Sequence, residues 1–284
     1  MNIEYIVKNI PFENYTINDI LLNDINLSKR LLKFLINNRL ILRNNSICNT
    51  NTYVKINDVI KVFLDYEEDN SNIVPINMDL DIVYQDDWLL IINKPSGIAI
   101  HPSILHYSDS LSNGVRYYFD SINLKKKIRP VNRLDLNTSG LVIFAKCSYI
   151  HDMLSLQMQD GSFKKTYLAL IHGKLESKKG VIDLPIARRS GSIIERCVDF
   201  ENGKKSITEY EVVTYNKKDN QSLVKCNLLT GRTHQIRVHF SYIGHPLVGD
   251  NLYGIDDSVN GHKLDCCLLE FIHPITKKVL KISH

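Results

Sequence analysis

The chain has 284 residues, of which 44% are hydrophobic and 23% are charged, values typical of a soluble globular protein. The net charge of +4 at pH 7 is compatible with a nucleic-acid partner but does not require one. No apolar run approaches the roughly 18 residues of a membrane span, and the N-terminus lacks a signal-peptide pattern, so we expect a cytoplasmic protein without a membrane partner.

Residues 1–66 predict a compact first unit. Leucines and an isoleucine recur at helical spacing between Leu27 and Ile36, with Asn26 as a possible N-cap. The same helix carries Lys29, Arg30 and Lys33, which lie three and four residues apart and share a face. Short strand-like runs follow at 40–42 and 59–62.

This first unit resembles the S4 RNA-binding module, which has a basic helix followed by a strand with the pattern G-D-x-I-x-V. Asp58, Ile60 and Val62 match that pattern, whereas Asn57 replaces the glycine. The resemblance implies a small α/β domain that binds RNA through Lys29, Arg30 and Lys33. The alternative is a small helical cap with a solvated basic face.

The segment 67–78 is predicted to be a linker, because it is polar and acidic, contains Pro75 and shows no apolar period. Residues 79–284 then alternate strands and helices, which indicates a mixed α+β domain on one large sheet. The predicted helices cover 110–119, 148–159 and 234–243, and the predicted strands cover 166–171, 208–214, 222–229 and 267–272. The stretch 87–102 predicts two strands, separated by a break at Lys94-Pro95 and a turn at Gly97.

The stretch VNRLDLNTSGLVIFAK at 131–146 places Arg133 and Asp135 two residues apart, just before an apolar strand at 141–145. Side chains two apart on extended backbone point the same way, so both can face one pocket. A rigid strand end is where a reactive carboxylate would be well positioned. The alternative is a surface ion pair, which contributes little.

Two later stretches also carry candidate residues. FKKTYLALIHG at 163–173 alternates as a strand and contains Lys165 and Tyr167, although a strand tyrosine is usually a packing residue.

The stretch 228–254 predicts a turn through Arg232 and a helix from His234. The alternative to a functional role is a helix with a basic face whose histidines are satisfied by ordinary hydrogen bonds. His234 and His239 are five apart, which is not the spacing of a helical zinc pair.

Basic residues gather in several short runs, and together these predict a phosphate-binding surface, although any single run is usually a solvated face. The runs are Lys125–Lys127 with Arg129 and Arg133, Lys164–Lys165, Arg188–Arg189, and Lys204–Lys205. The six cysteines form no C-x-x-C pair, so we expect reduced thiols and no zinc site.

Four ordered motifs resemble the RluA/RluD family of RNA pseudouridine synthases. The family patterns are NKPxGxxVHP, HRLDxxTSG, K-x-Y-x-A and TGRxHQIRxHxxxxGHPxxGDxxYG, and this chain follows them from Asn93 to Gly254. Asn132 and Asp265 stand where the family usually has histidines.

The resemblance implies a large mixed, mainly antiparallel β-sheet with flanking helices, and an isomerase that needs no cofactor or metal. It implies that Asp135 is catalytic, that Arg237 pairs with it, and that Tyr167 stacks on the target base. RNA contacts are expected from Arg133, which could fill the place of the flipped base, and from Lys165 and Arg232. Whether Asp135 attacks the sugar, attacks the base or removes a sugar proton stays open.

We expect the substrate to be structured RNA, with large-subunit ribosomal RNA favoured because S4-bearing members of the family mostly act there, and transfer RNA as the alternative. A rival from another class is an S4-type RNA-binding protein without catalysis. A nucleoside hydrolase would instead release free uracil. We expect a monomer.

Overall fold

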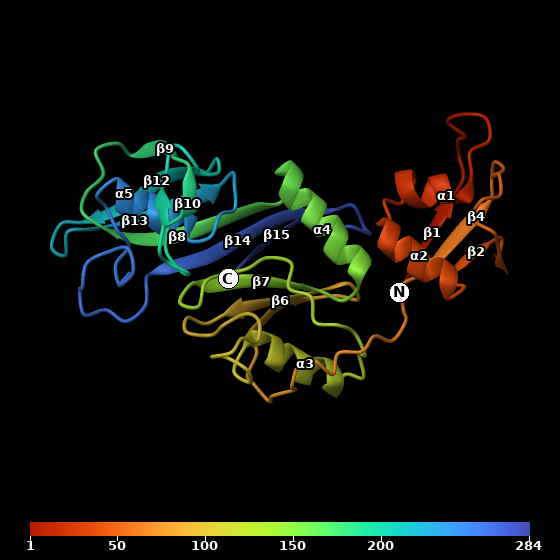
Figure 1. Cartoon of the computed structure of the whole chain (residues 1–284), viewed down its shortest axis with the longest axis horizontal. Helices are drawn as coiled ribbons and strands as arrows, with labels where there is room; N and C mark the ends of the chain where they lie inside the picture. The colour runs from red at the N-terminus through yellow and green to blue at the C-terminus, as the bar shows by residue number, and fades with distance from the viewer.

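The computed structural model describes all residues, 1–284, as two β-sheets, an additional β-hairpin and a small number of helices. The four-stranded sheet of the N-terminal unit and its helices lie at one end of the long axis, and α5 (Gln235–Tyr242) lies at the other end (Figure 1). No helix is long and apolar enough to cross a membrane.

The N-terminal unit has strand order β1-β4-β2-β3, and its strands pair antiparallel. Leu31, Leu32 and Leu35 of α2 are buried, as the helical spacing predicts. The N-cap of α2 is Ser28, whose Oγ accepts from Leu31 N at 3.4 Å, and not Asn26. Asn26 instead lies in the turn between η1 and α2, where its backbone is in the left-handed region with a φ of 61°. The elements are β1 (Asn2–Ile6), α1 (Ile17–Asp19), η1 (Ile20–Asp24), α2 (Lys29–Asn37), β2 (Ile41–Arg43), β3 (Ser46–Ile47) and β4 (Val59–Phe63).

The segment after β4 has no helix or strand, yet it is bound along its length to the larger unit. The buried Lys126 ammonium donates to the carbonyl oxygens of Tyr66 at 2.7 Å and Leu64 at 3.3 Å. Arg129 forms an ion pair with Glu68, and Ile73 is buried in the core. The stretch predicted to be a linker is therefore packed rather than loose.

The N-terminal unit is also docked directly onto α4. In α4 (Ser148–Asp160), the Tyr149 hydroxyl donates to Ile25 O at 3.0 Å, and the Ser148 hydroxyl shares a hydrogen bond of 3.2 Å with the hydroxyl of Tyr66. One hydrophobic cluster of 40 buried residues runs continuously through both units. The two units therefore share a core and have a fixed relative orientation.

The large sheet has nine strands in the order β5-β6-β7-β14-β8-β13-β12-β9, with β15 paired to β14. Only the β7–β14 pair is parallel, so the predicted mixed, mainly antiparallel sheet is confirmed. The elements are β5 (Ile82–Gln85), β6 (Leu89–Lys94), α3 (Leu111–Ser121), β7 (Ser139–Ala145), α4 (Ser148–Asp160), β8 (Lys164–His172), β9 (Lys179–Asp183), β10 (Ile186–Arg188), β11 (Arg196–Val198), β12 (Ile207–Asn216), β13 (Gln221–Leu228), α5 (Gln235–Tyr242), β14 (Leu264–Ile272) and β15 (Val279–Ser283).

Helices α3 and α4 cover opposite faces of the β6–β7 pair (Figure 1). Alternate residues of a strand point to opposite faces, and both strands are apolar on both faces. Leu90 and Val142 therefore pack with α3, whereas Leu89 and Leu141 belong to the cluster that contains α4. This doubly covered pair forms a rigid base for the turn that precedes β7.

One predicted strand is absent: residues 98–102, after Gly97, form no strand. The carbonyl oxygens of Ala99 and Ile100 accept from Leu111 N at 2.8 Å and Ser112 N at 3.0 Å. These backbone groups satisfy the free amides at the start of α3, so they are not available for a sheet ladder.

Candidate active site

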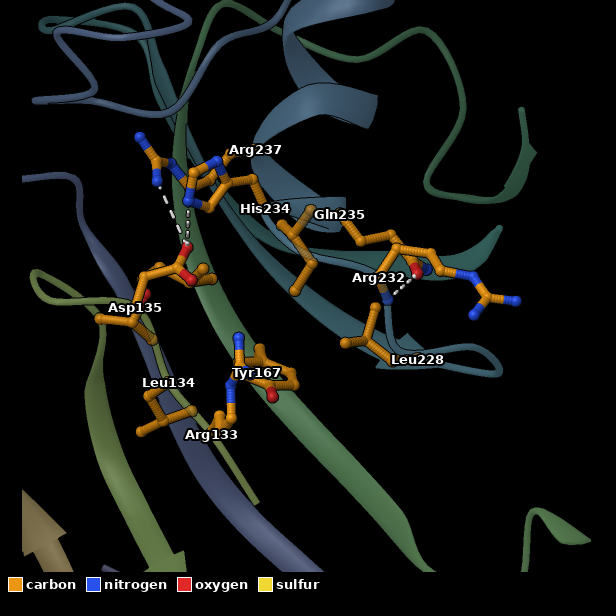
Figure 2. Close-up of a pocket in the computed structure, with 12 residues that line it drawn as sticks. Arg133, Leu134, Asp135, Tyr167, Leu228, Arg232, His234, Gln235 and Arg237 are labelled. Atoms are coloured by element: carbon orange, nitrogen blue, oxygen red, sulfur yellow. Dashed lines mark hydrogen bonds and ion pairs between the residues drawn. The ribbon is translucent and has the colours of Figure 1, made fainter. Parts of the chain in front are cut away.

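A cavity of about 70 Å³ lies where the turn before β7, strand β8 and the start of α5 meet (Figure 2). It brings together five of the nine residues to which the sequence assigned a site role, including the three expected to be catalytic. Its lining consists of Arg133, Leu134, Asp135, Thr138, Tyr167, Leu228, Arg232, His234, Gln235, Ile236, Arg237 and Leu264.

The turn that carries Asp135 is fixed by the buried side chain of Lys94. Its ammonium donates to the carbonyl oxygens of Leu136 at 3.0 Å and of Pro95 and Ile98 at 2.9 Å each. Burial lowers the pKa of Lys94 to about 8, and the charge of Asp135 opposes that shift. The three carbonyls satisfy all three donors of the ammonium, so Lys94 ties this turn to the end of β6.

The two residues that stand in place of the family's histidines hold the backbone near the cavity but do not line it. The amide of Asn132 donates to Leu141 O and accepts from Ile143 N, each at 2.9 Å, and so replaces a strand partner for β7. Asp265 accepts from Ser139 Oγ at 2.6 Å and lies 3.0 Å from His284 Nε2. Both residues therefore position the start of β7.

Arg237 connects Asp135 to a buried carboxylate, Asp250. Its Nε and Nη2 donate to the two oxygens of Asp250 at 2.7 and 2.8 Å, while Nη1 reaches Asp135 Oδ2 at 3.3 Å. Burial raises the pKa of Asp250, but the hydrogen bonds and charge of Arg237 outweigh this effect and hold the pKa below its usual value. The guanidinium is thus held by Asp250 and presented to Asp135.

His234 is a second neighbour of Asp135, with Nε2 3.7 Å from Oδ2 (Figure 2). Its Nδ1 lies 2.7 Å from the hydroxyl of Tyr253, which accepts from Arg196 N at 2.8 Å. That hydroxyl can donate its own proton to Nδ1, which leaves the proton of a neutral imidazole on Nε2, the nitrogen nearer Asp135. Burial lowers the pKa of His234, which favours this neutral form.

Tyr167 lies on β8 with 5% of its surface exposed, and it borders the cavity. Burial raises its pKa well above the usual value, with smaller contributions from Cys266 and Asp135, so the hydroxyl stays protonated. Lys165, two residues earlier, does not line the cavity. Its Nζ would lie 3.6 Å from a Cβ placed on Gly231, and burial lowers its pKa.

The exposed residues expected to contact RNA form two groups that lie far apart on the molecule. Arg133 and Arg232 border the cavity, and the guanidinium of Arg232 points away from Asp135 (Figure 2). Lys29 and Lys33 line a hollow beside α2, at the opposite end of the long axis from α5 (Figure 1), whereas Arg30 is exposed outside it.

Sequence reasoning did not assign a site role to His234, Asp250, Tyr253 or His262. The first three lie within the stretch 228–254, where matching letters alone do not show what each side chain contacts. His262 lies outside every motif, yet its Nε2 lies 2.8 Å from Thr138 Oγ1. Burial lowers its pKa to about 4, and the charge of Arg237 adds to that shift.

Comparisons with known proteins agree with this geometry. Residues 88–242 match the family model for RNA pseudouridylate synthase. An uncharacterised RNA pseudouridine synthase of Bacillus subtilis, YhcT, is 40% identical over 232 residues, covering 81% of this chain and 76% of the relative. The ribosomal large subunit pseudouridine synthase D of Blochmanniella floridana is 37% identical, covering 81% of this chain and 74% of the relative. The solved structure of human RNA pseudouridylate synthase domain containing 1 superposes with a TM-score of 0.62 at 28% identity, covering 72% of this chain and 83% of that chain.

Proposed function

The chain belongs to the RNA pseudouridine synthase family of isomerases, and we propose that it converts specific uridines of large-subunit ribosomal RNA to pseudouridine, with Asp135 as the reacting carboxylate. The observation that carries this assignment is the convergence of Asp135, Tyr167 and Arg237 on one cavity, although they come from three separate elements. The retention of all three argues against a non-catalytic RNA-binding protein.

The reaction breaks the bond between C1′ and N1 of the uridine and forms a bond between C1′ and C5. C5 loses a proton and N1 gains one, so the mass of the RNA is unchanged. Asp135 acts on the nucleotide as a carboxylate, and Arg237 supplies a fixed positive charge 3.3 Å from it. Because the product stays in the chain, free uracil is the sign of hydrolysis rather than isomerisation.

Tyr167 holds the base in this proposal. Its buried ring is fixed by the sheet, and a flat ring is a suitable platform for stacking. Uridine in folded RNA must leave its stack to reach the cavity, at a cost of a few kcal/mol. Arg133, exposed at the rim, is placed to occupy the vacated position in the RNA.

Large-subunit ribosomal RNA is favoured as the substrate for two reasons. Several relatives at about 37% identity carry names that state this substrate. The S4-like domain that we propose for residues 1–66 places Lys29, Arg30 and Lys33 far from the cavity, at the other end of the molecule (Figure 1). An RNA that contacts both regions must be large and folded.

Site-resolved mapping of pseudouridine in a strain that lacks the gene tests the proposal. Sites that vanish from large-subunit ribosomal RNA, and return with the wild-type gene but not with Asp135→Asn, would support it. Sites lost only from transfer RNA would replace the proposed substrate. An unchanged map, together with release of free uracil from RNA by the purified protein, would contradict the proposed reaction.

A further inference from the structure

A second cavity, of about 380 Å³, adjoins the one that contains Asp135. It lies beside the hairpin β10–β11, which is separate from the large sheet. Arg232 lines both cavities, and its guanidinium points away from Asp135 (Figure 2). The lining consists of Ile186, Ala187, Arg188, Arg196, Asn202, Lys204, Gly231, Arg232 and Thr233.

The charge of this cavity is entirely positive. Four of its lining residues are cationic, namely Arg188, Arg196, Lys204 and Arg232, and none is acidic. None of the four has a carboxylate within 4.0 Å. A group of unpaired cations on a folded surface is unfavourable unless an anion neutralises it.

The backbone forces these charges together. Arg188 and Arg196 are direct cross-strand partners in β10–β11, and like charges at such positions destabilise a hairpin. Lys204 is held beside β10 by two hydrogen bonds between its backbone and that of Ile186, of 2.9 and 3.0 Å. The fold therefore places at least three cations side by side at a cost to its own stability, which favours a functional explanation.

The hairpin is also connected to the candidate active site. Arg196 N donates to the Tyr253 hydroxyl, which contacts His234 Nδ1 at 2.7 Å. His234 in turn lies 3.7 Å from Asp135. The second cavity therefore has a fixed position relative to the reacting carboxylate.

We propose that this cavity is a phosphate subsite, which binds the RNA backbone immediately beside the uridine that enters the Asp135 cavity. The inference rests on the proposed function and adds a substrate-positioning site to it. Guanidinium groups bind phosphate oxygens in a two-point geometry that ammonium groups cannot match, and three of the four cations are arginines. Phosphate contacts set the register of the RNA but do not read its sequence, so the site positions the target without selecting it.

The double substitution Arg188→Ala with Lys204→Ala tests the proposal, since both side chains are exposed and neither lines the Asp135 cavity. The matched control is Lys217→Ala with Lys218→Ala, which removes the same charge from the exposed turn after β12. The strand β13 separates that turn from the cavity, and its eight residues span roughly 25 Å.

The dissociation constant for an RNA that contains the target uridine is measured at several salt concentrations. It is then measured for a set of RNAs, each of which carries a single methylphosphonate at one of the positions flanking the target uridine. We expect the test variant to bind about tenfold more weakly and to lose about one to two units of log–log salt slope. We also expect one flanking methylphosphonate to weaken binding by the wild type and the control, and to weaken it less in the test variant, which keeps only Arg196 and Arg232 in the cavity. An unchanged salt slope, or an equal methylphosphonate penalty in all three proteins, would overturn the subsite.

These binding measurements do not depend on turnover. A wild-type protein that binds with the expected slope but makes no pseudouridine would contradict the proposed function and leave the subsite standing. Melting temperatures guard against misfolding, because removal of one member of the Arg188–Arg196 pair should not lower the stability of the hairpin.

Discussion

Asp250 binds Arg237 through both of its carboxylate oxygens, at 2.7 and 2.8 Å, in a pair that is almost completely buried. The same carboxylate accepts from the backbone amides of Leu252 at 3.1 Å and Tyr253 at 3.2 Å, so the loop after α5 fixes its orientation. The guanidinium of Arg237 is therefore held in place before substrate binds, and its Nη1 remains free to donate to Asp135. A charge that is fixed before the reaction stabilises developing charge without the cost of reorganisation.

The first prediction concerns Asp135→Asn, which keeps the size of the side chain and removes its charge. We expect turnover to disappear while the affinity for RNA changes little, because the binding surface is untouched. Single-turnover assays and RNA binding measure the two effects separately. Asp79→Asn, at an exposed position, is the control. Residual isomerisation within tenfold of wild type would remove Asp135 from the reaction.

The second prediction concerns Asp250→Asn, which leaves the Arg237 fork without its charged partner. Removing one member of a buried ion pair costs about 3–5 kcal/mol in general, so we expect a clear fall in the free energy of unfolding. We also expect a lower single-turnover rate under conditions in which the variant is folded, with RNA affinity maintained. If the folded variant turned over at the wild-type rate, Asp250 would have a structural role only.

The sequence predicted the elements whose patterns are local. The apolar spacing of α2 and the alternation of β8 are visible over a few residues. The strands of the small hairpin β10–β11 were missed because they are three residues long and only partly buried. The docking of the two units was also missed, since Lys126 binds backbone carbonyl oxygens, which every residue has, and no sequence pattern marks them.

Only those residues of the candidate site that belong to the family motifs were predicted, and most of their contacts with other side chains were not. Asp135 and Arg237 lie 102 residues apart, so only the family resemblance suggested that they meet. The partner of Arg237 was not suggested, because a carboxylate 13 residues beyond it could have faced solvent equally well. Tertiary packing decides such contacts, and a single sequence does not show it.

The third prediction separates the ring of Tyr167 from its hydroxyl. Tyr167→Phe keeps the ring and the packing on β8, whereas Tyr167→Ala removes both and leaves a hole in the core cluster. A stacked base contributes about 1–3 kcal/mol, so productive binding should fall far more in Ala than in Phe. Apparent KM and single-turnover rate are measured after melting curves establish that each variant is folded. An equally severe loss of rate in both would instead assign proton transfer to the hydroxyl.

The fourth prediction concerns pH and His262, whose pKa is lowered from the usual value of about 6.5 to about 4, chiefly by burial. Between these two values the unfolded chain binds a proton at this site that the folded chain does not. The free energy of unfolding should therefore fall as the pH is lowered through that window, by up to about 1.4 kcal/mol per pH unit from this group. Denaturant melts from pH 4 to 7 should show a flatter dependence in His262→Gln, and identical slopes would count against the prediction.

The last prediction concerns the basic face of α2. If Lys29, Arg30 and Lys33 contact RNA phosphates, the triple Ala variant should bind long structured RNA more weakly. The salt dependence should flatten by roughly one unit of log–log slope per lost contact, while the rate at saturating RNA is maintained. A short RNA that holds only the target loop is the internal control, because α2 lies at the far end of the molecule from the Asp135 cavity (Figure 1).

Substitution is a better test than truncation here. Removing residues 1–70 would also remove the backbone partners of Lys126 and the ion-pair partner of Arg129, and would expose the apolar surface under the N-terminal unit. A loss of activity after truncation would then report on stability as much as on binding. The side chains of Lys29, Arg30 and Lys33 are exposed and carry no ion pair, so their removal leaves this docking intact. An unchanged salt slope on long RNA would reduce the N-terminal unit to a structural cap on α4.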